Sequence, residues 1–205
     1  MNEHNRRDQV LRHERVSSDS EPLILVDASD REVGFMSKAR CHEGRGVLHR
    51  AFSLFIFNPD GQLLMQQRSA EKRLWPGYWS NSCCSHPRRG ESLQSAADRR
   101  LWQELGMRCA LSPLFKFRYQ AQFDATGAEN ELCSVYIGCS SGPVRANVSE
   151  IADWCWIDPA QLQAEVQLGG RRFTPWFRIE WDRIWMQLHS ALWHAQEASG
   201  AWVSR

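Results

Sequence analysis

The chain has 205 residues, a length that favours one domain with additions over two separate domains. Its 25 basic and 24 acidic side chains nearly cancel, which argues against a surface that binds nucleic acid and leaves room for one local basic pocket. Seven cysteines show no paired framework, no N-terminal run has the order of a signal peptide, and no apolar run reaches about 20 residues. We therefore expect a cytoplasmic protein without membrane insertion.

Polar residues fill the N-terminal end of the chain. Residues 1–21 are rich in Arg, Asp and Ser and show no sustained periodicity, so we expect a flexible tail there. One domain is predicted over residues 22–199, followed by a short C-terminal tail over residues 200–205.

Strands are predicted in the first third of this domain. Residues 23–27 are the first candidate strand. Residues 48–57 and 62–68 are two further candidates, and they flank the segment Asn58-Pro59-Asp60-Gly61. Because this segment consists of turn-forming residues between two apolar runs, it predicts a β-hairpin.

An amphipathic helix is predicted over residues 92–105. Its apolar residues recur at steps of three and four, and Gly106 follows the last of them as a helix C-cap. Arg100 and Glu104 are four residues apart, so they share one face of this helix.

Strands and one more helix are predicted in the second half of the chain. Residues 115–123 alternate between aromatic and polar types, and residues 129–138 and 154–157 follow as strands. Thr174 and Pro175 suit the N-cap and first position of a helix. The apolar face of that helix would contain Phe177, Trp181, Ile184, Trp185, Leu188 and Leu192. This mixture without regular βαβ alternation predicts an α+β sandwich on a mixed sheet.

A thiol and an imidazole stand two residues apart in the segment Asn81–Glu91. If Cys84 and His86 lie on an extended backbone, both point to the same face and Cys83 points to the other. Cys84 then combines with His86 as a proton-transfer or metal site. The alternatives are a small buried hydrophobic residue and a structural zinc site, although no second Cys or His pair has suitable spacing for zinc.

Three histidines and two glutamates form a second candidate constellation. Glu129 and Glu131 are two apart on a predicted strand, so their carboxylates face one side and repel unless a cation or a shared proton relieves them. With His42, His49 and His86 they offer a ligand set that suits Mn, Mg or Zn. The alternative is a group of surface histidines beside a solvated acidic turn.

The residues from Ser85 to Met107 follow the spacing of the Nudix box. Glu91 and Glu104 match its acidic positions, whereas Ser85 replaces the leading glycine, and Arg100 and Gln103 replace two glutamates that hydrolases of this family use to hold magnesium. These departures resemble type 1 isopentenyl diphosphate isomerases, which have the Nudix fold. Further similar segments are 42–49, 74–79, Tyr119 with Glu129-Asn130-Glu131, and Thr174-Pro175-Trp176.

The resemblance implies a Nudix-type α/β/α sandwich and a role for each matching residue. Proton transfer falls to Cys84 and Glu131, aided by Tyr119, with Trp176 as a cavity wall that stabilises a cation. Tyr119 and Trp176 could instead be core residues, and Glu104 a solvated helix-end acid. The implied substrate-binding residues are Lys38, Arg68, Lys72, Ser85 and Arg100. The implied metal ligands are His42, His49, His86, Glu129 and Glu131, which hold one divalent ion tightly, and Glu104, which binds magnesium with the substrate diphosphate.

The preferred hypothesis is a metal-dependent 1,3-allylic proton shift on a small diphosphate, converting isopentenyl into dimethylallyl diphosphate. A Nudix diphosphohydrolase is the alternative enzyme. A non-catalytic Nudix-fold module that binds ligands or senses redox state through Cys83 and Cys84 is the third hypothesis. The oligomeric state, monomer or homodimer, stays open.

Overall fold

The computed structural model describes residues 14–198, with side chains as far as residue 188. Residues 1–13 and 199–205 lie outside the described part, and with them most of the predicted N-terminal tail and the predicted C-terminal tail; the side chain of Leu192 also lies outside it. In chain order the described elements are β1 (Pro22–Val26), β2 (Glu32–Ser37), α2 (Lys38–Cys41), β3 (His49–Phe57), β4 (Leu63–Arg68), β5 (Trp79–Ser80), β6 (Cys83–Ser85), α3 (Leu93–Leu105), β7 (Leu111–Asp124), β8 (Gly127–Cys139), β9 (Ile151–Ile157), α4 (Pro159–Leu168) and α5 (Pro175–Ala198).

The strands form one mixed sheet with β3 at its centre. The main path through the sheet runs β2-β1-β3-β4-β5, and β6 and β8 also pair with β3. The β3–β8 pairing is parallel, whereas β3 runs antiparallel to β1, β4 and β6. β7 extends the sheet beyond β8, and β9 pairs with β4. β3 therefore lies between β8 on one side and β1, β6 and β4 on the other.

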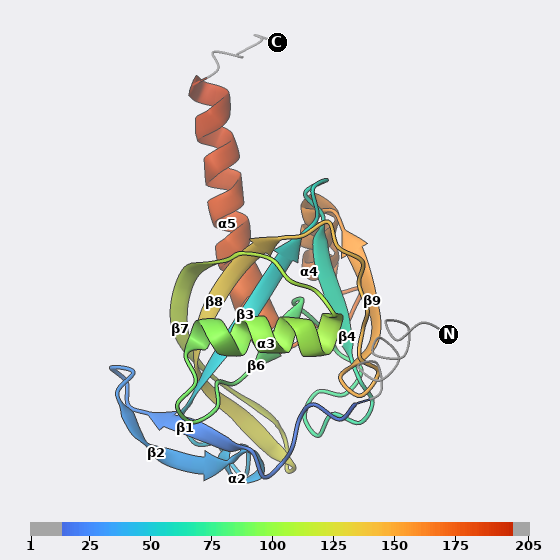
Figure 1. Cartoon of the computed structure of the whole chain (residues 1–205). Coiled ribbons are helices and arrows are strands. Elements are labelled where there is room, and N and C mark those ends of the chain that lie inside the picture. The colour runs from blue at the N-terminus through green and yellow to red at the C-terminus, as the bar shows by residue number, and fades with distance from the viewer. Residues whose placement is uncertain (1–13, 199–205) are drawn as a thin grey trace.

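Helices cover both faces of the sheet, with α3 across one face and α4 and α5 on the other (Figure 1). β3 is apolar on both sides, as a strand between two helical layers must be. Phe52, Leu54 and Ile56 pack in the core under α3, while Ala51 and Phe55 pack in the core that includes α5. The α/β/α sandwich predicted from the sequence is confirmed.

Most of the predicted elements are present, with different bounds. The hairpin turns at residues 58–61, where Gly61 has φ 77°, and α3 ends at Gly106 in the left-handed conformation. β7 is longer than predicted, and β2, α2, β5, β6 and α4 were not predicted. α4 has a clear sequence signal in Asp158, whose side chain accepts hydrogen bonds from the backbone of the first turn.

The described part of the predicted N-terminal tail contacts the domain. Val16 is buried, and its carbonyl oxygen accepts a 2.7 Å hydrogen bond from Arg100. Asn147 donates to the Glu14 carbonyl oxygen at 2.9 Å. The domain limits at residues 22 and 199 stay a prediction. None of the helices in the described residues is both long enough and apolar enough to cross a membrane.

Candidate active site

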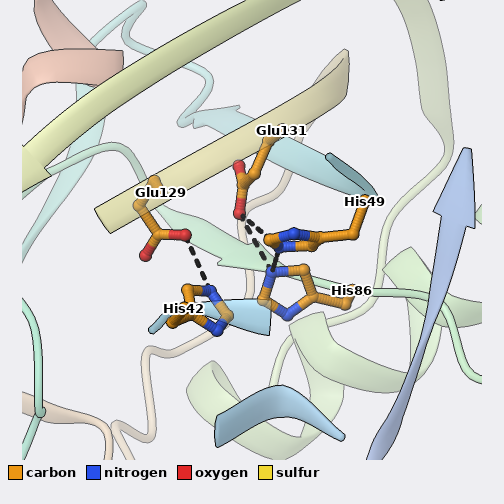
Figure 2. Close-up of side chains that lie close together, drawn as sticks. All are labelled: His42, His49, His86, Glu129 and Glu131. Atoms are coloured by element: carbon orange, nitrogen blue, oxygen red, sulfur yellow. Dashed lines mark hydrogen bonds and ion pairs between the residues drawn. The ribbon is translucent and has the colours of Figure 1, made fainter. Parts of the chain in front are cut away.

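Five buried side chains converge where β3, β6 and β8 lie side by side (Figure 2). His42 ends α2, His49 begins β3, and His86 follows β6. Glu129 and Glu131 both come from β8, and the parallel pairing of β3 with β8 places His49 opposite Glu131. The ligand atoms of all five residues lie within 4.8 Å of one another, and no residue is more than 8% exposed. Surface histidines beside a solvated acidic turn are thereby excluded.

Backbone carbonyls set the orientation of two of the imidazoles. The Nδ1 atoms of His42 and His49 lie 2.7 Å from the carbonyl oxygens of Lys38 and Val47. A carbonyl only accepts, so each Nδ1 carries the hydrogen and each Nε2 presents a lone pair to the centre of the cluster. This arrangement of an imidazole between a backbone acceptor and a cation is typical of metal-binding histidines.

The distances in the cluster fit a divalent ion. His49 Nε2 lies 3.1 Å from His86 Nε2, which lies 2.9 Å from Glu131 Oε1. Two neighbouring ligands that each lie about 2.1 Å from an octahedral ion are about 3.0 Å apart. Glu129 Oε2 lies 2.7 Å from His42 Nε2 yet makes no hydrogen bond. Two carboxylates with three neutral imidazoles also match a double positive charge.

The titration behaviour of the cluster reflects its burial and its crowded charges. Burial opposes the ionisation of Glu129 and Glu131, but contacts with His42 and His49 outweigh it and hold both carboxyl pKa values below the usual range. Burial and the neighbouring histidines hold the pKa of His86 well below its usual value. The acids are therefore ionised, and His86 is neutral as a ligand must be.

The two residues predicted to transfer protons line the cavity beside this cluster. Cys84 and Glu131 both line a cavity of about 520 Å³, together with Tyr119 and Trp176. The Tyr119 hydroxyl donates a 2.7 Å hydrogen bond to Glu131 Oε2, the contact that the sequence left open. Tyr119 and Trp176 are also members of the hydrophobic core, so the core interpretation is confirmed for both, and the functional role of each stays a prediction.

Cys84 sits in β6 as a protonated thiol. Its Sγ donates to Asn81 Oδ1 at 2.8 Å and accepts from Trp176 Nε1 at 3.3 Å. Burial, followed by the charge of Glu180, raises the pKa of Cys84 to about 12. Cys83 faces the opposite side of the sheet, in the core under α3, as the period of two predicts.

Basic side chains line the same cavity. Lys38, Arg68, Lys72 and Arg100 all lie in its wall, as does Ser85. Burial, with the nearby charge of Lys72, lowers the pKa of Lys38 to about 8. The five candidate substrate-binding residues are thus brought together from β4, β6, α2, α3 and the loop after β4.

Buried acids neutralise part of this basic set. Arg100 Nη2 lies 2.6 Å from Glu104 Oε1 and 3.2 Å from Glu150 Oε2, and Lys72 also pairs with Glu150. Glu104 is 2% exposed, so it is not a solvated helix-end acid, and it lies behind Arg100. Glu150, in the loop before β9, was missed because no local pattern marks it.

Arg68 is held against the aromatic wall of the cavity. Its guanidinium donates to the carbonyl oxygens of Leu74 and Trp75 at 2.8 and 3.1 Å and lies 5.2 Å from the ring centre of Trp176. Trp75 in turn packs edge-on against Trp176, with ring centres 5.3 Å apart. The aromatic wall therefore carries one positive charge beside the Trp176 ring.

Comparison with known proteins agrees with this geometry. A family model described as NUDIX domain matches residues 47–177. The chain is 45% identical over 157 residues to an isopentenyl-diphosphate Delta-isomerase from Serratia proteamaculans, covering 77% of this chain and 87% of that protein. A protein of the same name from Burkholderia multivorans is 42% identical, covering 80% and 92%. A solved structure from Deinococcus radiodurans superposes with a TM-score of 0.66 at 24% identity, covering 80% of this chain and 98% of that one, and supports the fold.

Proposed function

Because the chain belongs to the isopentenyl-diphosphate Delta-isomerase family, within the Nudix fold, we propose that it interconverts isopentenyl and dimethylallyl diphosphate. The observation that carries this function is the pairing of two proton-transfer groups in one cavity. Cys84 holds a proton and Glu131 is ionised, and both line the space beside Trp176. A 1,3-proton shift needs one such donor and one such acceptor.

The protonation states set the direction of transfer. In forming the dimethylallyl isomer, the Cys84 thiol donates its proton to the terminal alkene carbon, and the electron pair of the double bond forms the new C–H bond. The resulting tertiary cation loses a proton from the neighbouring methylene to the Glu131 carboxylate, and those electrons form the new double bond. The Tyr119 hydroxyl stabilises that carboxylate before it accepts the proton.

The histidine and glutamate cluster holds one divalent ion in this proposal. His42, His49, His86, Glu129 and Glu131 are its ligands, and Mn, Mg and Zn all suit this set of nitrogen and oxygen atoms. When bound, the ion supplies positive charge that keeps both glutamates ionised and fixes the position of Glu131. The fit rests on the convergent lone pairs and on the unsatisfied Glu129 Oε2.

The basic wall binds the diphosphate. Lys38, Arg68, Lys72, Ser85 and Arg100 supply charge and hydrogen-bond donors at one cavity. A magnesium ion that enters with the substrate would recruit Glu104, which lies behind Arg100. The indole of Trp176 screens the cation from water and stabilises it through the ring face.

The reaction product distinguishes the proposed isomerase from the alternative hydrolase. Incubation with isopentenyl diphosphate and magnesium should give an acid-labile allylic diphosphate without release of inorganic phosphate. Release of phosphate or pyrophosphate, with no allylic product, would contradict the isomerase and favour a hydrolase. Arg100 and Gln103 argue against water activation, because they replace acids that a hydrolase needs in the box.

The redox-sensing hypothesis has less support. Cys83 and Cys84 face opposite sides of β6, and Cys83 is fully buried, so the two thiols do not form one reactive pair. The seven cysteines, all within the described residues, form no disulfide. We propose a cytoplasmic location on this ground. A monomer and a homodimer are both compatible with the proposed site.

A further inference from the structure

A buried acid lies behind the Cys84 thiol and has no part in the reaction described above. Glu180, in the second turn of α5, is 0% exposed. Its Oε2 atom makes no hydrogen bond, and among the described residues no lysine or arginine forms an ion pair with it. An ionised carboxylate in such a place is strongly disfavoured, so the environment selects the neutral acid.

The groups that face Glu180 come from four elements. Cys133 in β8 hydrogen-bonds its side chain, with Sγ 3.5 Å from Oε1, and Ser53 in β3 lies next to Cys133. The charges of Glu131 in β8 and of Cys84 in β6, if it ionised, oppose a negative Glu180, and Arg183 in α5 acts weakly in the other direction. Burial is the largest effect and raises the pKa of Glu180 to about 8.

Cys133 and Ser53 together connect Glu180 to Cys84. The antiparallel pairing of β3 with β6 places Ser53 opposite Cys84, and the Ser53 hydroxyl donates to Cys84 Sγ at 3.7 Å. The same oxygen accepts from Cys133 Sγ at 3.4 Å. The Cys133 thiol has one hydrogen, so it cannot donate to Ser53 and to an ionised Glu180 at once.

We propose that Glu180 is a positioning residue for proton transfer: as a neutral acid it donates to Cys133 Sγ, which leaves the Cys133 hydrogen for Ser53 and thereby turns the Ser53 hydroxyl toward Cys84 Sγ. The sulfur then has a hydrogen-bond donor when its own proton goes to the substrate. An ionised Glu180 would draw the Cys133 hydrogen to itself and place a second negative charge near the Cys84 sulfur. This role rests on the proposed isomerase function, in which Cys84 donates the proton.

The test is the pH dependence of kcat at saturating substrate. In the wild type, kcat should fall roughly tenfold per pH unit above the pKa of Glu180, as for any single essential acid. Glu180→Gln keeps a donor to Cys133 at every pH, so it should retain most of the kcat at pH 7 and lose the alkaline decline below pH 10. Glu180→Met removes the donor and should lower kcat already at pH 7. Asp182→Asn, at an exposed acid on the same helix, should behave as the wild type.

Two features make the test specific. Lys38 also titrates near pH 8. Its charge serves diphosphate binding, so its titration changes KM and leaves kcat at saturating substrate unaffected. The isosteric Glu180→Gln should fold, as a thermal melt would verify, even if Glu180→Met does not. An alkaline decline retained in Glu180→Gln would overturn the role of Glu180 alone. A wild type without isomerase turnover would instead overturn the proposed function and this role together.

Discussion

Replacing Arg100 by methionine tests the buried charge network at the altered Nudix box. The Arg100 side chain is 2% exposed, and besides Glu104 and Glu150 it donates to the carbonyl of Val16. Methionine keeps much of the volume but no charge. Two buried carboxylates would then remain, with Lys72 alone beside Glu150. Removing one partner of a buried ion pair typically lowers the free energy of unfolding by about 3–5 kcal/mol.

The assay is urea unfolding followed by tryptophan fluorescence at pH 7 without added magnesium. Arg99→Met is the matched control, because Arg99 pairs with Glu91 nearer the surface, where such pairs contribute about 0–1 kcal/mol. The double variant Arg100→Met/Glu104→Gln should recover part of the lost free energy of unfolding, since it removes one of the two carboxylates left without Arg100. An Arg100→Met protein within about 1 kcal/mol of the wild type would refute the importance of this network.

The same network gives an acid-dependent signature. Burial opposes the ionisation of Glu150, but Lys72 and then Arg100 lower its pKa to about 2. A carboxyl group whose pKa is lower in the folded than in the unfolded protein stabilises the fold at pH values above its unfolded pKa of about 4.5. This stabilisation is lost as the pH falls toward 2. Arg100→Met should therefore lose less stability than the wild type between these two pH values. Equal acid sensitivity in the two proteins would contradict the assigned cause.

Three further predictions address the chemistry. Cys84→Ala should lower kcat by about 10²–10⁴, the range for a lost general acid or base, while Cys83→Ala keeps wild-type turnover; equal losses in two folded variants would refute the opposite-face assignment. Glu104→Gln should raise KM with normal metal content after gel filtration, and His49→Ala should lose the metal; the reverse pattern would show that the two sites are exchanged. Trp176→Phe and then Trp176→Leu should lower turnover in that order, by roughly tenfold or more for a cation–π loss of about 2 kcal/mol. A cationic ammonium analogue should lose more affinity than substrate does in Trp176→Leu.

Local patterns predicted the strands and helices that have strong periodicity. The hairpin at residues 58–61 and the helix α3 with its glycine cap follow from turn chemistry and apolar spacing. The short strands β5 and β6 hold two and three residues, too few for any period to be detected. They exist because β4 and β3 offer them hydrogen-bond partners, which is a tertiary cause.

In the candidate site, too, the features set by spacing within one element were predictable from the sequence, and those set by tertiary contacts were harder to predict. The orientation of Cys84 against Cys83, and of Arg100 toward Glu104, followed from spacing along one element. The metal cluster joins α2, β3, β6 and β8; the residue types suggested it in advance, and the family resemblance favoured it over surface histidines. Glu150 lies in a loop with no pattern. Glu180 carried a signal that was overlooked, because an acid three residues after Phe177 falls within the apolar stripe of α5.

The central claim is tested most directly by incubating the protein with isopentenyl diphosphate and Mg²⁺ in D₂O and following the reaction by proton NMR. The account predicts that the exomethylene signals disappear, that a vinyl proton and two methyl groups of the dimethylallyl isomer appear, and that one methyl gains deuterium, because the Cys84 proton exchanges with solvent. Unchanged isopentenyl diphosphate, phosphate release, or a dimethylallyl product without deuterium would contradict it.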